Sequence, residues 1–156
     1  MERGVIEAEG AHRGRTIGED EIEPVTLATW RRGKGVSGAA YVQALQAAHA
    51  YGRVMAAFFE RYDLLLMSTL GSPAVPVGWL RCDPAIYAER LFAFRPNTQA
   101  FTVTGQPAMT VPLAMSGDGL PIGLQFTARM GEEGLLYRLA GQLEQASPWR
   151  GRRPPI

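Results

Sequence analysis

The feature that most constrains the fold is a stripe of apolar and small side chains that recurs at steps of three and four residues from Tyr41 to Tyr62. Steps of this size place side chains on one face of an α-helix. Ser37 precedes the stripe and is a good N-cap residue, so we expect a helix that begins just after it. Burying one Leu or Phe side chain stabilises a fold by about 1.5–3 kcal/mol, so this face must pack against a substantial partner. The small residues Ala48 and Gly52 favour packing within a globule over a dimer seam.

Composition limits the classes of protein that this chain can belong to. With 156 residues, 46% of them hydrophobic, the chain suits a single folded domain over residues 1–156. The net charge is +1, and acidic and basic residues are interspersed, so the sequence has no charged region that indicates binding to nucleic acid or an acidic membrane. No apolar run approaches the roughly 20 residues that span a bilayer, and the first residues do not form a secretory signal pattern. We therefore expect a cytoplasmic protein with no nucleic-acid partner and no membrane partner.

Further local signals predict a mixture of helices and strands, which is an α/β fold. Residues 1–19 lack periodicity and are expected to be extended or poorly ordered. Helices are expected from Pro24 to Gly33, after Asp83-Pro84, from Asn97 to Gly105 and after Glu132, and strands over 64–67, 108–114 and 121–128. The run from Leu64 to Met67 is apolar on both faces, as in a fully buried strand of a parallel or mixed sheet.

The acids at 19–23 and the histidines do not predict a metal site. Four acids lie close together before the helix predicted from Pro24 (Glu19, Asp20, Glu21 and Glu23). A solvated helix start is favoured for them over cation binding, because the spacing of a calcium loop and its glycine are missing. His12 and His49 are far apart in the sequence, so no zinc motif is present. We predict neither a metal nor a cofactor, and His49 is expected to be a packing residue.

Two nucleophile arrangements can also be weighed. The single cysteine, Cys82, excludes an internal disulfide. A Cys82-dependent enzyme is a remaining alternative, although no histidine partner can be identified, and a loop cysteine is favoured. The only lysine, Lys34, lies among arginines and glycines, where burial is not expected to lower its pKa. Lys34 and Ser37 are therefore expected to form a loop before a helix and not a catalytic pair.

Three segments carry a family resemblance. They are Tyr62-Asp63-Leu64-Leu65-Leu66 with the following Thr69 and the proline-containing loop after it, the stretch from Phe101 to Pro112 that contains Thr-Gly-Gln-Pro, and Asp118-Gly119-Leu120-Pro121-Ile122-Gly123-Leu124-Gln125-Phe126. Together with the Ser147-Pro148-Trp149 ending, their order and spacing resemble the C-terminal part of amidase signature hydrolases, from about Glu21 onwards. Within that family, the resemblance is greatest to bacterial amidases of the 6-aminohexanoate-cyclic-dimer hydrolase kind. Ser68 and Thr102 depart from the usual Pro and Asn of the pattern, which can alter a cleft rim or a supporting hydrogen bond.

The resemblance implies the C-terminal portion of an α/β/α fold, with a mixed β-sheet flanked by helices. The family cleaves amides with a nucleophilic Ser, a second Ser and a Lys base, all amino-terminal to the region matched here. This sequence has no Ser-Ser pair and no second lysine, so none of its residues corresponds to the catalytic Ser and Lys residues of the family. We expect the chain to supply sheet scaffold and part of a substrate cleft, and to be inactive alone.

The resemblance also suggests cleft-facing polar groups, for which we choose Arg95, Asn97 and Thr98. The alternative for these residues is that Asn97 caps a helix and Arg95 points to solvent. Gln106 and Gln125 are expected to be structural and to hydrogen-bond loop backbone beside the sheet.

An incomplete sheet would leave open edges and uncovered apolar helix faces. The expected partners are therefore a second copy in a homo-oligomer or the missing N-terminal amidase region, with a small amide substrate only in the completed protein. The alternative function is a non-catalytic truncated-gene product that acts as an oligomerising or interaction module.

Overall fold

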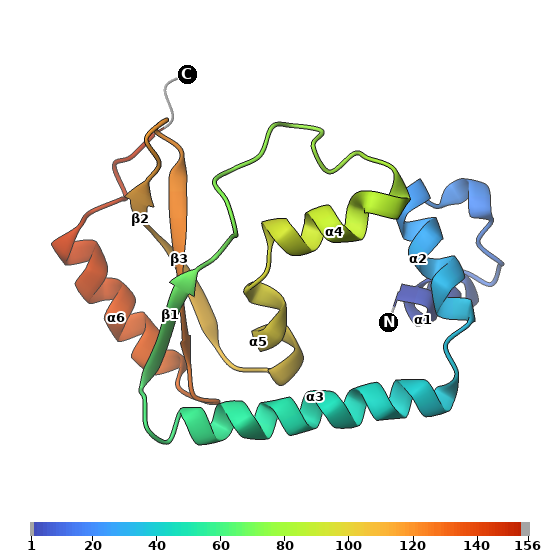
Figure 1. Ribbon diagram of the computed structural model, residues 1–156, viewed down its shortest axis with the longest axis horizontal. Helices are drawn as coiled ribbons and strands as arrows, with labels where there is room; N and C mark the ends of the chain where they lie inside the picture. Colours follow the sequence, from blue (N-terminus) through green and yellow to red (C-terminus); the bar gives the residue numbers. More distant parts are fainter. Residues whose placement is uncertain (1, 154–156) are drawn as a thin grey trace. The chain divides into compact units, whose positions relative to one another are not determined.

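The computed structural model describes residues 2–153, and Figure 1 shows the order of the helices and strands. In chain order they are α1 (Glu2–His12), the short 3₁₀ helix η1 (Glu19–Glu21), α2 (Pro24–Lys34), α3 (Gly38–Phe58), β1 (Leu64–Ser68), α4 (Pro84–Phe94), α5 (Thr98–Thr104), β2 (Ala108–Met115), β3 (Pro121–Ala128) and α6 (Glu133–Ala146). Helices and strands both contribute to this part of the chain, which confirms the predicted α/β class.

The described residues group into two compact units. The first unit contains the described part of residues 1–45 together with residues 77–91, and the second contains residues 46–76 and the described part of 92–156. Helices α3 and α4 each begin in the first unit and end in the second. A compact unit within a chain is not the same as an independently folding domain, so the single domain over residues 1–156 stays a prediction.

The first unit has a helix, α1, where we expected an extended or poorly ordered segment. The contacts that support this helix do not depend on a regular apolar pattern in the sequence. Arg13 Nε lies 2.5 Å from Glu9 Oε1, a pair four residues apart that supports a helical turn. The helix also packs against α2, whose Trp30 is buried. The prediction for residues 1–19 was wrong over α1, because weak periodicity, charge and glycine content do not exclude a helix that such contacts support.

The helix ends predicted at Ser37, Asp83 and Gly105 are confirmed. Ser37 Oγ accepts a hydrogen bond from the Ala40 N–H at 3.1 Å, just before α3. Asp83 Oδ1 accepts one from the Ala85 N–H at 2.8 Å at the start of α4. Gly105 ends α5 with a φ of 78°, a backbone conformation that residues with a Cβ rarely adopt. These ends depend on local chemistry, which explains why the sequence predicts them.

Only part of the apolar stripe on α3 is buried. Met55 and, just after the helix, Phe59 are 9% and 1% exposed, whereas Tyr41 and Leu45 are 57% and 44% exposed. The helix ends at Phe58, before the predicted end of the stripe. The periodicity therefore predicted the helix correctly, but the extent of burial differs between its two halves in the described structure.

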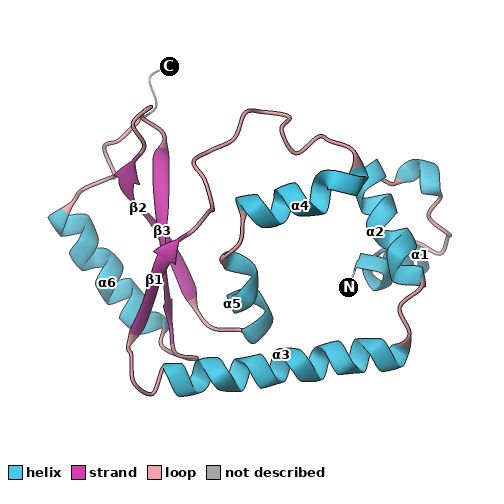
Figure 2. Cartoon of the chain, in the orientation of Figure 1, coloured by secondary structure: helices cyan, strands magenta, loops and turns pink. Residues whose placement is uncertain are grey.

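The second unit is built on a sheet of the order β1-β3-β2, in which both pairs of strands are antiparallel. Figures 1 and 2 show α6 on one side of this sheet and α5 on the other. The α6 side contains an apolar core of Val111, Phe126, Ala128 and Leu136. On the other side, Phe101 packs with Met55 and Phe59, and Leu65 and Met67 of β1 contact this cluster. The three strands thus have apolar cores on both faces.

Strand β1 is less buried than its sequence predicts. It pairs with β3 alone among the described strands, and Leu66 is 54% exposed. The prediction of a fully buried strand was therefore wrong for this structure. An apolar side chain at this position needs a further neighbour to be covered, and the described residues supply none.

None of the described helices combines the length and hydropathy that crossing a membrane would take.

Candidate functional site

The end of strand β1 opens into a hollow of about 280 Å³, which we call the β1-end hollow. Two chain segments form its wall, the loop that follows β1 and the start of β3. Its lining residues carry no charge and are Ser68, Leu70, Gly71, Ser72, Pro73, Ala74, Pro121, Ile122 and Gly123. Both segments belong to the stretches that carry the family resemblance. The hollow is thus our candidate functional site in the second unit.

Gly123 allows the two walls of the hollow to approach each other. The Thr69 N–H donates to Gly123 O at 2.9 Å, and the Thr69 and Thr110 hydroxyl oxygens lie 3.1 Å apart. A Cβ on Gly123 would lie 2.7 Å from Thr110 Cγ2 and 3.0 Å from Thr69 Oγ1, which is too close for normal packing. A glycine inside a strand pattern often marks such an approach, so this position had a detectable signal in the sequence that we did not use.

Gly71 fixes the loop after β1 in a similar way. Its N–H donates to Phe94 O at 2.8 Å. A Cβ at this position would collide with Ala93 O and lie 3.2 Å from Pro96 Cδ. The absence of a side chain at Gly71 therefore lets the loop lie against the segment that connects α4 and α5.

The residues predicted to face the cleft have two different environments. Arg95 is exposed, while Asn97 and Thr98 are half-buried at the start of α5. Asn97 Nδ2 donates to Ser68 O at 2.7 Å and lies 3.3 Å from Ser68 Oγ, and it makes no side-chain cap bond to α5. Because Ser68 lines the hollow, the hydrogen bond from Asn97 fixes part of the hollow's wall. A direct contact of Arg95, Asn97 and Thr98 with substrate stays a prediction.

Gln106 and Gln125 are buried, as expected for structural residues, with 9% and 3% exposure. Their partners differ from the prediction of loop backbone. Gln106 Oε1 accepts a hydrogen bond from the Thr104 hydroxyl, and Gln125 Nε2 donates to Thr127 Oγ1 at 3.4 Å. Both amides therefore bond to threonine side chains, which the sequence pattern alone did not indicate.

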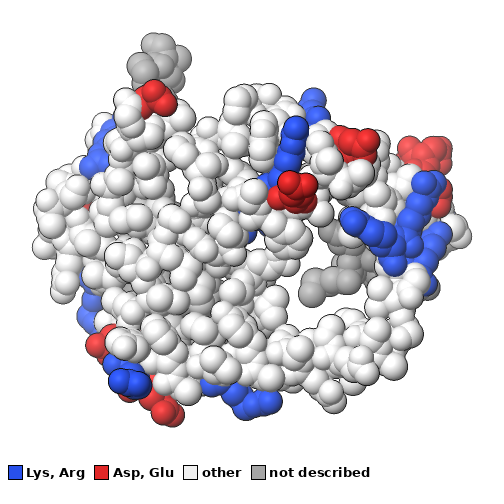
Figure 3. Space-filling view, in the orientation of Figure 1, with Lys and Arg blue, Asp and Glu red and all other residues white. Residues whose placement is uncertain are grey.

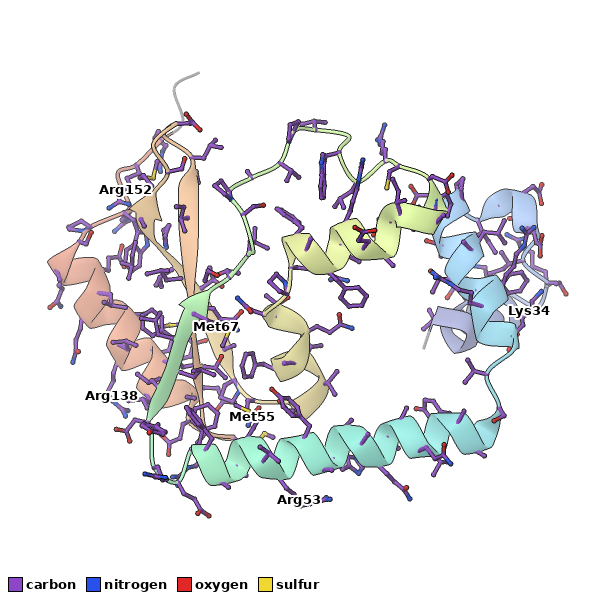
Figure 4. All side chains as sticks on the ribbon, in the orientation of Figure 1. Lys34, Arg53, Met55, Met67, Arg138 and Arg152 are labelled. Atoms are coloured by element: carbon purple, nitrogen blue, oxygen red, sulfur yellow. The ribbon has the colours of Figure 1, made fainter. Side chains whose placement is uncertain are left out.

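Several charged side chains of the first unit form ion pairs with one another. Figure 3 shows acidic and basic side chains gathered near α2, whereas the sheet in the second unit is mostly uncharged on the face in view. Glu19 pairs with Arg31 and lies 3.8 Å from Lys34, and Lys34 Nζ lies 3.5 Å from the centre of the Trp30 ring. Lys34, labelled in Figure 4, is thus an ion-paired and half-exposed side chain.

Hydrogen bonds also hold Glu21. The Arg15 guanidinium donates to both carboxylate oxygens at 2.6 and 2.7 Å, and the Gly18 N–H donates at 2.9 Å. These donors, Arg15 first, lower the pKa of Glu21 from 4.5 to about 2. The Arg31 guanidinium likewise lowers the pKa of Glu19. Two of the four neighbouring acids therefore form ion pairs with arginines, Glu19 with Arg31 and Glu21 with Arg15.

Across residues 2–153, no group of three or more His, Cys, Asp or Glu side chains is arranged to hold a metal ion. Cys82 is half-buried before α4, and no hydrogen bond joins it to a described histidine. His49 is exposed and lines a separate hollow of about 480 Å³ with Arg53, Glu60 and Arg129. The structure therefore adds no second argument for chemistry at Cys82.

The antiparallel sheet with helices on both sides and the hollow at the end of β1 define an α/β protein. The family described as "Amidase" matches residues 5–137. The chain belongs to the amidase family, as the resemblance in its sequence predicted.

Two relatives differ in the activities for which they are named. The chain is 34% identical to the 6-aminohexanoate-cyclic-dimer hydrolase of Pseudomonas sp. (strain NK87), with 97% of this chain and 32% of that protein covered. It is 30% identical to one subunit of the glutamyl-tRNA(Gln) amidotransferase of Halalkalibacterium halodurans, with 92% and 29% covered. These names differ in substrate, so family membership does not decide what this chain acts on.

Solved structures agree with the fold. A structure of 6-aminohexanoate cyclic dimer hydrolase matches with a TM-score of 0.87 and 32% identity, covering 98% of this chain and 34% of that one. The chain therefore spans about a third of the length of the relatives that it matches, and the α/β architecture is that of a fragment of the amidase fold.

Proposed function

We propose that this chain is the C-terminal segment of an amide (C–N) hydrolase and that it supplies sheet scaffold and part of the substrate cleft. In this proposal, the catalytic Lys and the two serines come from the amidase region that the chain does not match. The observation that carries the proposal is the β1-end hollow, because two segments of the family pattern form it without contributing a charged side chain. A small neutral amide fits a wall of this character, because Ser68 and Ser72 offer hydroxyl partners for its polar atoms and no charged side chain is buried with it.

The test is fragment complementation. The 156-residue chain is assayed for amide hydrolysis alone and mixed with the unmatched part of the 6-aminohexanoate-cyclic-dimer hydrolase of Pseudomonas sp. (strain NK87). We expect no turnover from either piece and turnover from the mixture. Turnover by the 156-residue chain alone that is lost in Lys34→Ala would contradict the proposal.

A matched pair of variants tests the role of the hollow. Ala74→Trp adds bulk to a lining residue, and Ala57→Trp adds the same bulk to an exposed position outside the lining. We expect Ala74→Trp to lower kcat/KM of the mixture by about tenfold or more, because substrate placement is disturbed, and Ala57→Trp to leave it unchanged. Equal effects of both variants on kcat/KM would show that the hollow is not part of the substrate cleft.

The second candidate function is a non-catalytic module that forms a homo-oligomer. The exposure of Tyr41 and Leu45 on α3, 57% and 44%, favours it, because an apolar helix face needs a cover. Sedimentation at micromolar concentration distinguishes the two functions. An oligomer that Leu45→Lys dissociates, together with an inactive mixture, would support the module, and a folded monomer would count against it. The cytoplasmic location stays a prediction in both cases.

A further inference from the structure

The second unit contains another hollow, of about 480 Å³, and α3 forms one of its walls. We call it the α3 hollow. Arg129, one of its lining residues, directly follows Ala128, which is the partner of Leu64 at the start of β1. Ser68, at the other end of β1, lines the β1-end hollow. The two hollows share no lining residue, so the α3 hollow is a separate feature at the opposite end of the strand.

The wall formed by α3 carries basic side chains that are not used elsewhere in the described structure. Arg53, labelled in Figure 4, and His49 are four residues apart and therefore lie on the same face of α3. Both are exposed, and neither side chain forms a hydrogen bond or an ion pair among the described residues. The Arg53 guanidinium is thus available to a ligand in the hollow.

Arg129 contributes a second guanidinium from the segment after β3. Its Nη2 donates to Phe59 O at 2.5 Å, which holds the side chain beside the end of α3. A guanidinium has five N–H groups, so this bond leaves further donors for a ligand. Glu60 is the one acid that lines the hollow, and it forms an ion pair with neither arginine. Two arginines and one carboxylate leave the lining with one positive charge in excess.

The buried part of the lining adds one polar donor to an apolar surface. Gln106 is 9% exposed, and its Oε1 accepts a hydrogen bond from the Thr104 hydroxyl. Its Nε2 donates to no described residue. Buried polar groups in proteins are nearly always hydrogen-bonded, so this amide needs an acceptor that the described residues do not supply. Phe59, which is 1% exposed, and Met130 provide apolar surface in the same hollow.

The geometry points to the α3 hollow as a binding site for a small organic carboxylate with a short apolar body. A carboxylate accepts hydrogen bonds from guanidinium and amide N–H groups, which are the donors of Arg53, Arg129 and Gln106. Its single negative charge matches the excess charge of the lining, whereas a phosphate dianion exceeds it. The hydrocarbon part of the ligand packs on Phe59 and Met130, and the volume lies in the usual range of small-molecule sites.

The inference does not depend on the proposed function, because none of these residues belongs to the β1-end hollow. Calorimetric titration of the 156-residue chain tests it with three probes, namely pentanoate, its uncharged analogue pentanamide and inorganic phosphate. We expect pentanoate to bind at least about tenfold more tightly than either of the others, because only pentanoate has both the charge and the hydrocarbon. Equal binding of pentanoate and pentanamide, or tighter binding of phosphate, would overturn the inference.

Two arginine variants give a matched comparison. Arg53→Gln removes a charge from the lining, and Arg138→Gln removes the same charge from an exposed position on α6 that does not line the hollow. We expect Arg53→Gln to weaken pentanoate binding by about tenfold and Arg138→Gln to change it by less than about twofold. Glu60→Gln should strengthen binding by about threefold, because it removes the one negative charge of the lining. Equal losses in Arg53→Gln and Arg138→Gln would mean that the chain attracts anions without a defined site.

Nuclear magnetic resonance of the wild type decides the question if circular dichroism shows that Arg53→Gln is not folded. Pentanoate should shift the Gln106 side-chain amide and the Gly52 backbone amide, which both belong to lining residues. Shifts that leave both signals unchanged would overturn the inference. The same titration is repeated on the mixture with the unmatched part of the Pseudomonas sp. (strain NK87) hydrolase. Unchanged affinity supports the site, loss of binding shows that the hollow is covered by protein and overturns it, and amide hydrolysis by the mixture bears only on the proposed function.

Discussion

Asn97 holds the end of strand β1 by donating its side-chain amide to the backbone carbonyl of Ser68 at 2.7 Å. The two residues are 29 positions apart, so this bond joins the start of α5 to the rim of the β1-end hollow. One side chain therefore fixes both the end of the strand and part of the wall of the candidate site.

Replacing Asn97 should cost more than replacing Ser68. Asn97→Ala leaves the Ser68 carbonyl at the end of β1 without this donor, and we expect the free energy of unfolding to fall by about 0.5–1.5 kcal/mol. Ser68→Ala keeps the backbone acceptor and loses only the contact with Oγ at 3.3 Å, so its effect should be smaller. Urea unfolding of the two variants measures the difference. A larger loss in Ser68→Ala would show that the hydroxyl is the main partner.

Gly71 and Gly52 should respond to alanine in opposite directions. A Cβ on Gly71 would collide with Ala93 O, so we expect Gly71→Ala to destabilise the fold by about 1–3 kcal/mol. A Cβ on Gly52 meets no atom within 4 Å, and alanine is the better helix former inside α3. Gly52→Ala should therefore stabilise by about 0.5–1 kcal/mol. Thermal unfolding tests both, and a stable Gly71→Ala would mean that the loop can move away without cost.

The sequence predicted those parts of the fold that depend on neighbouring residues. Ser37 and Asp83 cap helices as expected, Gly105 ends α5, and the hairpin of β2 and β3 forms around the turn at 116–119. In that turn, Ser116 Oγ accepts the Leu120 N–H at 3.0 Å. Each of these signals acts within a few residues, so no knowledge of the rest of the protein is needed to use it.

Burial was less predictable because it depends on distant partners. The apolar run at Leu64–Met67 is a strand, but Leu66 is exposed since only β3 lies beside it among the described strands. Tyr41 and Leu45 of α3 are exposed for a similar lack of neighbours. At the candidate site, the contact between Asn97 and Ser68 joins residues too far apart for a local pattern to reveal. The family resemblance located the right segments without giving their contacts.

Arg152 should stabilise the β2 edge. Figure 4 shows it beside β2, where Nη1 donates to Pro112 O at 2.9 Å and Nη2 lies 3.3 Å from Ser147 Oγ. Arg152→Ala should lower the free energy of unfolding by about 1 kcal/mol, measured by urea unfolding. Arg150→Ala removes a nearby arginine whose side chain makes no hydrogen bond among the described residues, and it is the control. Equal free energies of unfolding of the two variants would show that Arg152 does not stabilise this edge.

The ion pair between Glu21 and Arg15 should make the stability of the first unit depend on pH. The pKa of Glu21 is about 2 in the fold against an ordinary value of 4.5, so the folded state favours the ionised carboxylate. Its stabilisation is therefore fully present above pH about 4.5 and is lost as the pH falls towards about 2. Glu21→Gln removes the titration, so the wild type should exceed the variant in stability at pH 7 and lose that advantage between these two values. Unfolding of both proteins across pH 2–7 measures the difference, and Glu23→Gln is the matched control because its carboxylate forms no ion pair in the described structure. A difference between wild type and Glu21→Gln that stays constant down to pH 2 would show that the Arg15 and Gly18 donors do not act on the charge of Glu21.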